Sequence, residues 1–146
     1  MRRHSPTLHP TPQVFVFDLS KHPSFPTADS PFSPQHRLLG HTADGYGLSW
    51  SPHASQEGHL VSCGSDKLIC MWDLKSAGAK VEVDVVSKFE GHTDVVEDVA
   101  WHMFDPNVIG SVGDDRAVKI WDVRVKSSMD SMHTKVSSSE SRGEEP

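Results

Sequence analysis

The chain has 146 residues, 36% hydrophobic and 23% charged, and its 20 Asp and Glu against 14 Lys and Arg give a formal net charge of −6 at pH 7. No apolar run approaches the ~20 residues needed to cross a bilayer, and no apolar stretch follows Arg2 and Arg3, so neither a membrane span nor a secretory signal is predicted. The only two cysteines, Cys63 and Cys70, lie in successive strands of one predicted hairpin, where they could face each other. We expect a reduced, buried thiol pair, as in a nuclear or cytosolic protein.

The amino-terminal segment leads into one short strand. Residues 1–12 include three prolines, and we expect them to form a disordered leader. The apolar run over residues 14–19 (VFVFDL) predicts a strand ending in Phe-Asp. We interpret residues 13–24 as the end of a preceding degenerate blade, and residues 25–34, rich in Pro and Ser, as a loop.

Two stretches, residues 40–73 and 91–122, then repeat one pattern. Each begins with Gly-His and ends with Trp-Asp, and in each a Ser lies ten positions and an Asp six positions before the Trp. The shared residues are His41, Ser62, Asp66 and Trp72 in the first copy and His92, Ser111, Asp115 and Trp121 in the second. This pattern is the WD-repeat signature of a β-propeller blade.

The period is slightly long, because the Gly-His pairs are 51 residues apart and the Trp-Asp pairs 49, whereas one repeat has roughly 40–45. We therefore expect WD repeat 1 at residues 35–74, an insertion loop at 75–85 and WD repeat 2 at 86–124. Residues 125–146, of which seven are Ser, are expected to be a disordered tail. The predicted fold class is an all-β, partial WD40 β-propeller of about two to three four-stranded antiparallel blades, the last of them lacking its outer strand.

The repeated His, Ser and Asp also invite comparison with a hydrolytic triad. A nucleophilic Ser is exposed at a cleft, on a strained turn and beside an oxyanion hole, whereas both repeat serines fall in mid-strand. Each set also adjoins a Trp, whose indole N–H needs an acceptor once it is buried. We therefore predict a structural Trp–Ser–His–Asp hydrogen-bond network in each blade and no enzyme activity. The hydrolase alternative predicts labelling by a serine-directed probe that Ser111→Ala abolishes.

No cofactor or metal is predicted. The ten histidines and two cysteines form no His-x-x-His or Cys-x-x-Cys pair. Residues 45–47 (Gly-Tyr-Gly) lack the third glycine and the following helix of a phosphate-binding loop, and their glycines instead let the backbone pass close to a neighbour or a ligand. Direct nucleic-acid binding is disfavoured, because the sequence has no basic stripe.

Five segments carry a closer resemblance: FDLSKHPS, RLLGHTADGYGLSWSP, GHTDVVEDVAWH, LICMWDL and AVKIWDV. Over residues 13–124 the chain resembles the histone-binding WD-repeat family, the retinoblastoma-associated subunits shared by chromatin-assembly, deacetylase, remodelling and Polycomb complexes. The resemblance implies a seven-bladed propeller in the nucleus that works beside other chromatin-complex subunits. Its acidic top face would hold the amino-terminal tail of a core histone or a similar basic peptide.

The resemblance also implies which residues bind the tail: Asp44, Tyr46, Glu97 and Asp114. Asp44 departs from the family's usual Glu and has a shorter reach. Residues 13–124 carry 16 Asp and Glu against 9 Lys and Arg, a balance that steers a basic partner toward the protein. The alternative is a generic WD-repeat adaptor with a non-histone partner, and binding that survives Glu97→Lys together with Asp114→Lys would favour it.

Overall fold

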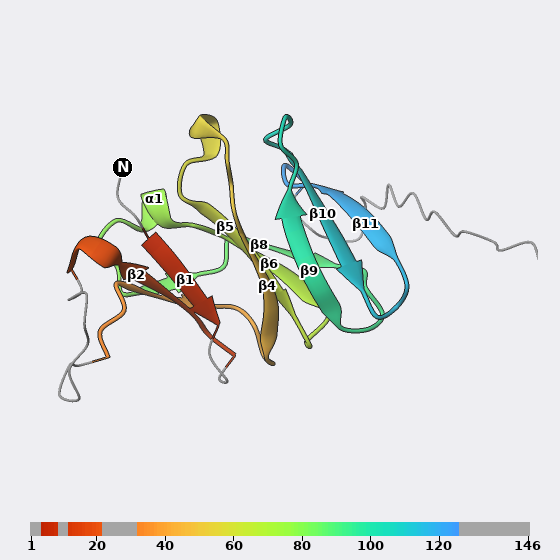
Figure 1. The fold of residues 1–146 in the computed structure, drawn as a ribbon, viewed down its shortest axis with the longest axis horizontal. Coiled ribbons are helices and arrows are strands. Elements are labelled where there is room, and N and C mark those ends of the chain that lie inside the picture. The colour runs from red at the N-terminus through yellow and green to blue at the C-terminus, as the bar shows by residue number, and fades with distance from the viewer. Residues whose placement is uncertain (1–3, 9–11, 22–31, 126–146) are drawn as a thin grey trace, which may run out of the picture.

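The computed structural model describes residues 4–8, 12–21 and 32–125 and contains three β-sheets side by side (Figure 1). We call these sheets the first, second and third blade. The first has the strand order β1 (His4–Leu8), β2 (Val14–Asp18), β3 (His36–Leu39) and β7 (Glu82–Asp84). The second has the order β4 (Gly45–Trp50), β5 (His59–Gly64), β6 (Leu68–Asp73) and β8 (Ser87–Glu90). The third contains β9 (Val96–Trp101), β10 (Val108–Gly113) and β11 (Val118–Asp122).

The second blade is the complete antiparallel unit that the repeat predicts. Its three inner strands come from one repeat, and its outer strand β8 comes from the start of the next repeat and pairs Phe89 with Ile69. In the third blade β11 has no outer strand among the described residues. The predicted all-β, partial propeller is therefore confirmed, with one complete blade between two others.

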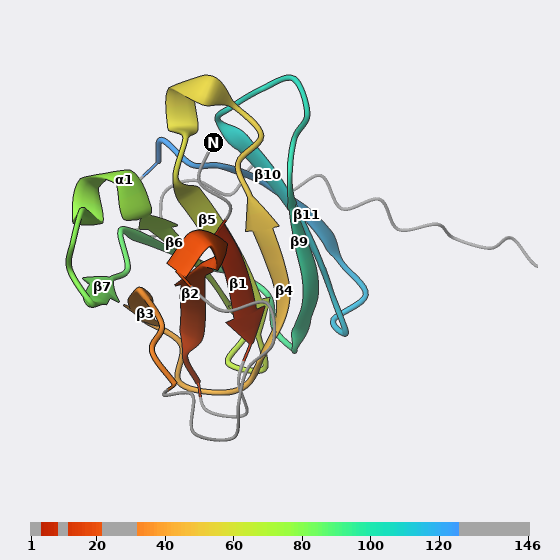
Figure 2. The same cartoon turned by 60° about the vertical axis from the view of Figure 1, so that its left-hand side comes forward.

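Two hydrophobic clusters cover the two faces of the second blade. One contains Val61, Ile69 and Met71 and packs against residues of the third blade, among them Val99 and Ile109. The other contains Leu60, Cys70 and Trp72 and packs against Val14, Val16 and Leu38 of the first blade. Figure 2 shows the first blade in front of the second. Burial between neighbouring blades thus holds the three sheets together, as expected for a repeat protein.

The two cysteines lie on opposite faces of the second blade and do not face each other. Cys63 pairs with Ile69 and Cys70 with Ser62, one register position apart, and side chains one position apart point to opposite faces of a sheet. Both thiols are free, and burial raises the pKa of each to about 12.

Two segments differ from the sequence-based expectations. His4–Leu8, expected within a disordered leader, form β1 and pair with β2, where Pro6 is tolerated because β1 is an edge strand. In the expected insertion loop, Asp73 accepts hydrogen bonds from the Lys75 and Ser76 amides and so caps the short helix α1 (Leu74–Ala77). The chain then forms β7, which pairs in parallel with β3.

Two predicted segments fall largely outside the described residues. Most of the expected 25–34 loop and all but the first residue of the expected 125–146 tail lie there. The described residues also include two short 3-10 helices, η1 (Leu19–Lys21) and η2 (Ala54–Gln56). In the part of the chain that is described, no helix is long and apolar enough to span a membrane.

Candidate functional site: the blade networks and the acidic rim

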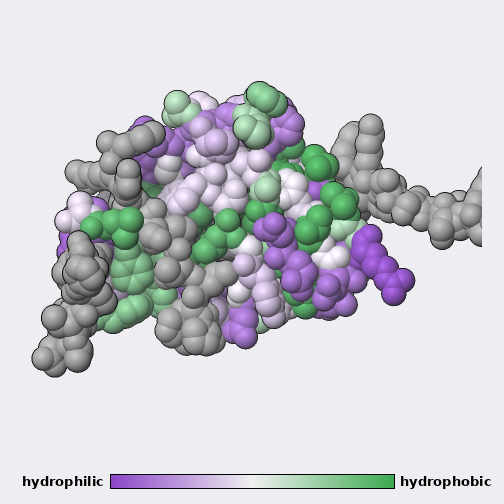
Figure 3. Space-filling view, viewed as in Figure 1, coloured by the Kyte–Doolittle hydropathy of each residue, from purple (hydrophilic) through white to green (hydrophobic). Residues whose placement is uncertain are grey.

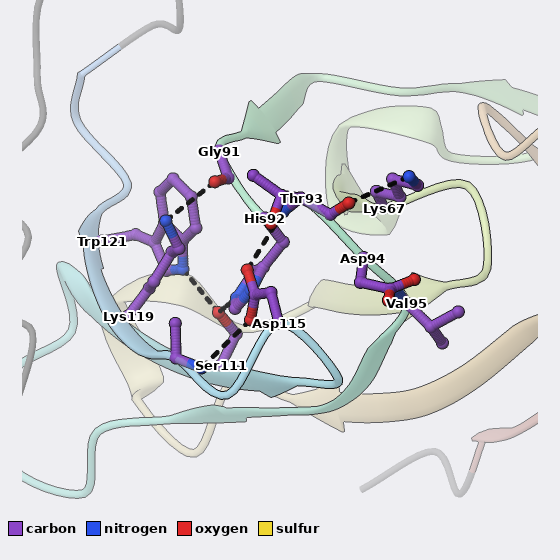
Figure 4. A network of polar contacts seen from close by, with 11 residues as sticks. Lys67, Gly91, His92, Thr93, Asp94, Val95, Ser111, Asp115, Lys119 and Trp121 are labelled. Carbon is purple, nitrogen blue, oxygen red and sulfur yellow. Dashed lines mark hydrogen bonds and ion pairs between the residues drawn. The ribbon is translucent and has the colours of Figure 1, made fainter. Parts of the chain in front are cut away.

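The third blade contains a continuous polar network (Figure 4). The Trp121 indole Nε1–H donates to Ser111 Oγ at 2.8 Å, and Ser111 Oγ lies 2.7 Å from His92 Nε2. His92 Nδ1 lies 2.8 Å from Asp115 Oδ2. The carboxylate can only accept, so His92 donates from Nδ1 and accepts at Nε2 from the Ser111 hydroxyl, an assignment that satisfies every group.

The second blade has the same network with one break. His41 Nε2 lies 2.6 Å from Ser62 Oγ, and His41 Nδ1 lies 2.9 Å from Asp66 Oδ2. The Trp72 indole, however, donates to the backbone carbonyl of Leu39 at 3.0 Å and not to Ser62. The expected Trp–Ser contact is therefore present in one blade and replaced in the other, because a buried indole N–H needs one acceptor of either kind.

Both carboxylates of these networks have lowered pKa values. For Asp66 and Asp115, burial by itself favours the neutral acid. Hydrogen bonds outweigh that effect and lower the pKa below its ordinary value: the His41 side chain and the Thr42 amide at Asp66, and the Thr93 amide and the His92 side chain at Asp115. Each ionised carboxylate thus holds the Gly-His loop of its repeat against the hairpin turn in which the aspartate lies.

The geometry gives these groups a structural role. Ser62 and Ser111 are buried within strands, with 0% and 2% of their surface exposed, and so are not presented to a substrate. Each hydroxyl belongs to a network that is satisfied inside its own blade. Among the described residues, no group of three or more His, Cys, Asp or Glu side chains could hold a metal ion.

A second set of contacts joins the second and third blades. The Trp101 indole donates to the Ser49 carbonyl at 3.1 Å, and the Lys67 ammonium donates to the Thr93 carbonyl at 2.9 Å. Strands β4 and β9 also approach each other closely at Gly47, where an added Cβ atom would lie 2.9 Å from Asp98 Oδ1 and 3.0 Å from Asp98 Cα. The Gly-Tyr-Gly backbone therefore passes close to the neighbouring blade, one of the two roles considered for its glycines.

The four residues implied in tail binding lie at one end of the blades. Asp44 directly precedes β4 and Tyr46 is its second residue, while Glu97 is the second residue of β9. Asp114 follows the end of β10, and its amide donates to the Val95 carbonyl just before β9. Both β4 and β9 begin at the lower end of the molecule in Figure 1, and all four residues are exposed.

Two further carboxylates join this end of the molecule, Asp94 before β9 and Asp98 within it. We call the exposed set the acidic rim; its members are Asp44, Asp94, Glu97, Asp98 and Asp114. None of the five forms an ion pair with another described residue. Sequence reasoning missed Asp94 and Asp98, although both stand in the quoted segment GHTDVVEDVAWH beside Glu97. Lys67 and Arg116, at the hairpin turns, are basic residues at the same end.

Three sheets side by side, with a buried polar network in the second and in the third, define a partial β-propeller of the WD40 type, a scaffold class that binds protein partners and is generally non-catalytic. The family described as WD domain, G-beta repeat matches residues 32–73 and 84–122. Because the two matches cover more than half of the 146 residues, the chain belongs to the WD-repeat family.

Proposed function

We propose that this WD-repeat protein binds the basic amino-terminal tail of a core histone, or a similar basic peptide, on its acidic rim. The proposal places it in the nucleus, as a subunit of chromatin assembly, remodelling or deacetylase complexes. The observation that carries it is the gathering of five exposed carboxylates, none paired with a described cation, at one end of two neighbouring blades. The resemblance to the histone-binding WD-repeat family supports the choice of a histone.

The chemistry of the rim suits an extended basic peptide. Glu97 lies in β9 and Asp114 directly follows the neighbouring strand β10, and both can accept charge-assisted hydrogen bonds from Lys and Arg side chains. Tyr46, with 51% of its surface exposed, can cover the aliphatic stem of such a side chain or form a cation–π contact. The Lys67 ammonium, which repels a peptide cation, is held beside β9 by its hydrogen bond to the Thr93 carbonyl.

A peptide titration tests the proposal. A fluorescently labelled histone amino-terminal tail peptide is titrated with the protein, and anisotropy gives the affinity. Glu97→Lys together with Asp114→Lys should weaken binding at least about tenfold, because each reversal replaces an attractive charge by a repulsive one. The matched control, Glu57→Lys together with Glu82→Lys, makes the same change in net charge at two exposed residues away from the rim and should leave binding nearly unchanged.

Equal losses in the two double variants would mean that net charge alone attracts the peptide. The second candidate function, a generic adaptor for a non-histone partner, rests on the WD repeats themselves. Failure of the parent protein to bind any basic tail peptide, with its fold verified by a cooperative unfolding transition, would favour that adaptor.

A further inference from the structure

The loop between β9 and β10 carries the two most exposed large apolar side chains among the described residues. Met103 is 75% exposed and Phe104 is 86% exposed. Figure 3 shows hydrophobic residues at the upper edge of the molecule, where Figure 1 places this loop, at the end opposite the acidic rim. Two adjacent large apolar side chains left in water are informative, because folding normally buries such groups. We call the pair the apolar anchor.

The fold of the loop does not require the apolar anchor. The loop between β4 and β5, in the second blade, begins with the same turn. There Ser51 Oγ accepts a hydrogen bond from the His53 amide at 3.4 Å, and in the third blade His102 Nδ1 accepts one from the Phe104 amide at 3.2 Å. The two residues at the tip of this turn are Pro-His in the second blade and Met-Phe in the third. The apolar pair is therefore not needed to form the turn.

The exposure of the anchor does not depend on a missing neighbouring blade. The second blade has another blade packed against each of its faces. Its own loop at this end nevertheless stays open to solvent, since Pro52, Ala54 and Ser55 are all exposed. The third blade contacts that loop at its side, where His53 Nε2 donates to the His102 carbonyl at 2.8 Å. Loop tips at this end of the molecule thus stay accessible even in an enclosed blade.

Hydrogen bonds hold the anchor loop in one shape. His102 Nδ1 accepts from the Asp105 amide at 2.9 Å as well as from the Phe104 amide. Asp105 Oδ1 in turn accepts from the Asn107 amide at 2.9 Å. The loop is closed at its base, where the His102 amide donates to the Val108 carbonyl at 2.9 Å. A preorganised loop loses little conformational entropy when a partner binds it.

Two imidazoles place one donor and one acceptor beside the anchor. The hydrogen-bond network assigns their protons. Because His102 Nδ1 accepts from two amides, the proton lies on Nε2, which is a donor on an exposed side chain. Because His53 Nε2 donates to a carbonyl, its Nδ1 is an acceptor, and this atom has no hydrogen-bond partner among the described residues. Both polar groups are thus available to a binding partner.

We propose that Met103 and Phe104 anchor a partner protein that has an apolar pocket, with an acceptor for His102 Nε2–H and a donor for His53 Nδ1 at its border. The anchor is convex, so its partner is concave, and a folded surface encloses an aromatic ring better than one extended peptide does. Aromatic residues and Met are enriched in the buried cores of such interfaces.

The charges at this end favour a protein over a membrane. Segments that lie on lipid surfaces are rich in Lys and Arg. In the two loops, residues 51–58 and 102–107, the charged residues are Glu57 and Asp105, and both are acidic. The anchor and the acidic rim lie at opposite ends of the blades, so the anchor does not rest on the function proposed for the rim.

Site-specific crosslinking gives the first test. The photoreactive amino acid p-benzoylphenylalanine replaces Phe104 in the full chain, in cells that produce the protein, and mass spectrometry identifies the linked residue. The matched control carries the same amino acid in place of Val81, which is 55% exposed and precedes β7 of the first blade. We expect a protein that is linked from position 104 and not from position 81, at a residue among apolar side chains of its folded surface.

Titration of that purified partner against the full chain gives the second test. Phe104→Ala should weaken binding at least about tenfold, as expected of a buried aromatic anchor, while Val81→Ala should leave it unchanged. His102→Asn keeps a side-chain oxygen for the loop amides and removes the Nε2–H donor, so it should weaken binding about fivefold. Because Phe104 is 86% exposed, Phe104→Ala should not change the urea midpoint.

Several results overturn the proposal. They are no specific link from position 104, a link to a second copy of the chain, and a partner whose affinity Phe104→Ala leaves unchanged. Flotation of the parent with phosphatidylcholine liposomes that Phe104→Ala abolishes also overturns it, since the anchor would then enter a membrane. A lower urea midpoint in Phe104→Ala would assign the side chain to the fold instead. Unchanged binding in His102→Asn overturns the role of the imidazole donor.

Discussion

The difference between the two blade networks predicts that equivalent serines contribute unequally to stability. Ser62→Ala leaves one buried group, His41 Nε2, without its partner, because Trp72 already donates to Leu39. Ser111→Ala leaves two, His92 Nε2 and the Trp121 indole N–H. The sequence alone predicts equal effects, since both serines hold the same position in the repeat.

The magnitudes follow from the number of groups left unsatisfied. Each buried donor or acceptor without a partner costs about 1–3 kcal/mol, so Ser62→Ala should lower the free energy of unfolding by that amount. For Ser111→Ala the indole adds about 1 kcal/mol, the lower end of the range, because Trp121 is only half-buried and water reaches part of it. We therefore expect Ser111→Ala to be the more destabilising variant by about 1 kcal/mol.

Two measurements check this difference. Urea unfolding followed by tryptophan fluorescence gives the two free energies of unfolding. In ¹H–¹⁵N spectra, Ser111→Ala should shift the indole signal of Trp121, whereas Ser62→Ala should leave that of Trp72 in place. Equal destabilisation would refute the reasoning; it would mean that the Trp121 indole turns to the carbonyl of Glu90, the residue aligned with Leu39.

Three further predictions follow from the packing and the charges. Gly47→Ala should lower the free energy of unfolding by about 1–3 kcal/mol, because the added Cβ would lie 2.7 Å from the Cys63 sulfur. Gly110→Ala is the matched control and should not destabilise, because its added Cβ would first meet Ile120 Cδ1, at an ordinary contact distance of 3.6 Å. In urea unfolding, Trp101→Phe should lower the free energy of unfolding by about 1 kcal/mol more than Trp50→Phe. The reason is that the Trp101 indole N–H has an acceptor, whereas the buried indole N–H of Trp50 has none among the described residues. Equal losses of unfolding free energy in the two variants would contradict this. The folded-state pKa values of Asp66 and Asp115 are lowered from 3.8, so the stabilisation that these carboxylates give is complete above that pH and is lost as the pH falls through the lower folded pKa. The free energy of unfolding, measured in urea at a series of pH values, should therefore fall more steeply with decreasing pH below about pH 4. The fall should be less steep in Asp115→Asn, which lacks one of the two carboxylates.

The sequence by itself determined the repeated unit. The spacing of Ser, Asp and Trp is the same in both copies, because the strands of a blade have nearly fixed lengths and the buried polar groups must meet. The apolar run over residues 14–19 likewise predicted a strand, which appears as β2 (Val14–Asp18). Local patterns suffice for such elements, since each is specified by neighbours a few residues away.

Other features depend on contacts between distant segments, and the sequence did not reveal them. β1 and β7 form because edges of the first blade offer unpaired backbone groups, and neither segment has a strong strand pattern of its own. The acceptor chosen by Trp72, the close passage of Gly47 beside Asp98 and the opposite faces of Cys63 and Cys70 follow from the register of the strands and the packing of the blades. The acidic rim is likewise a tertiary feature: two successive repeats bring carboxylates together only when β4 and β9 lie side by side.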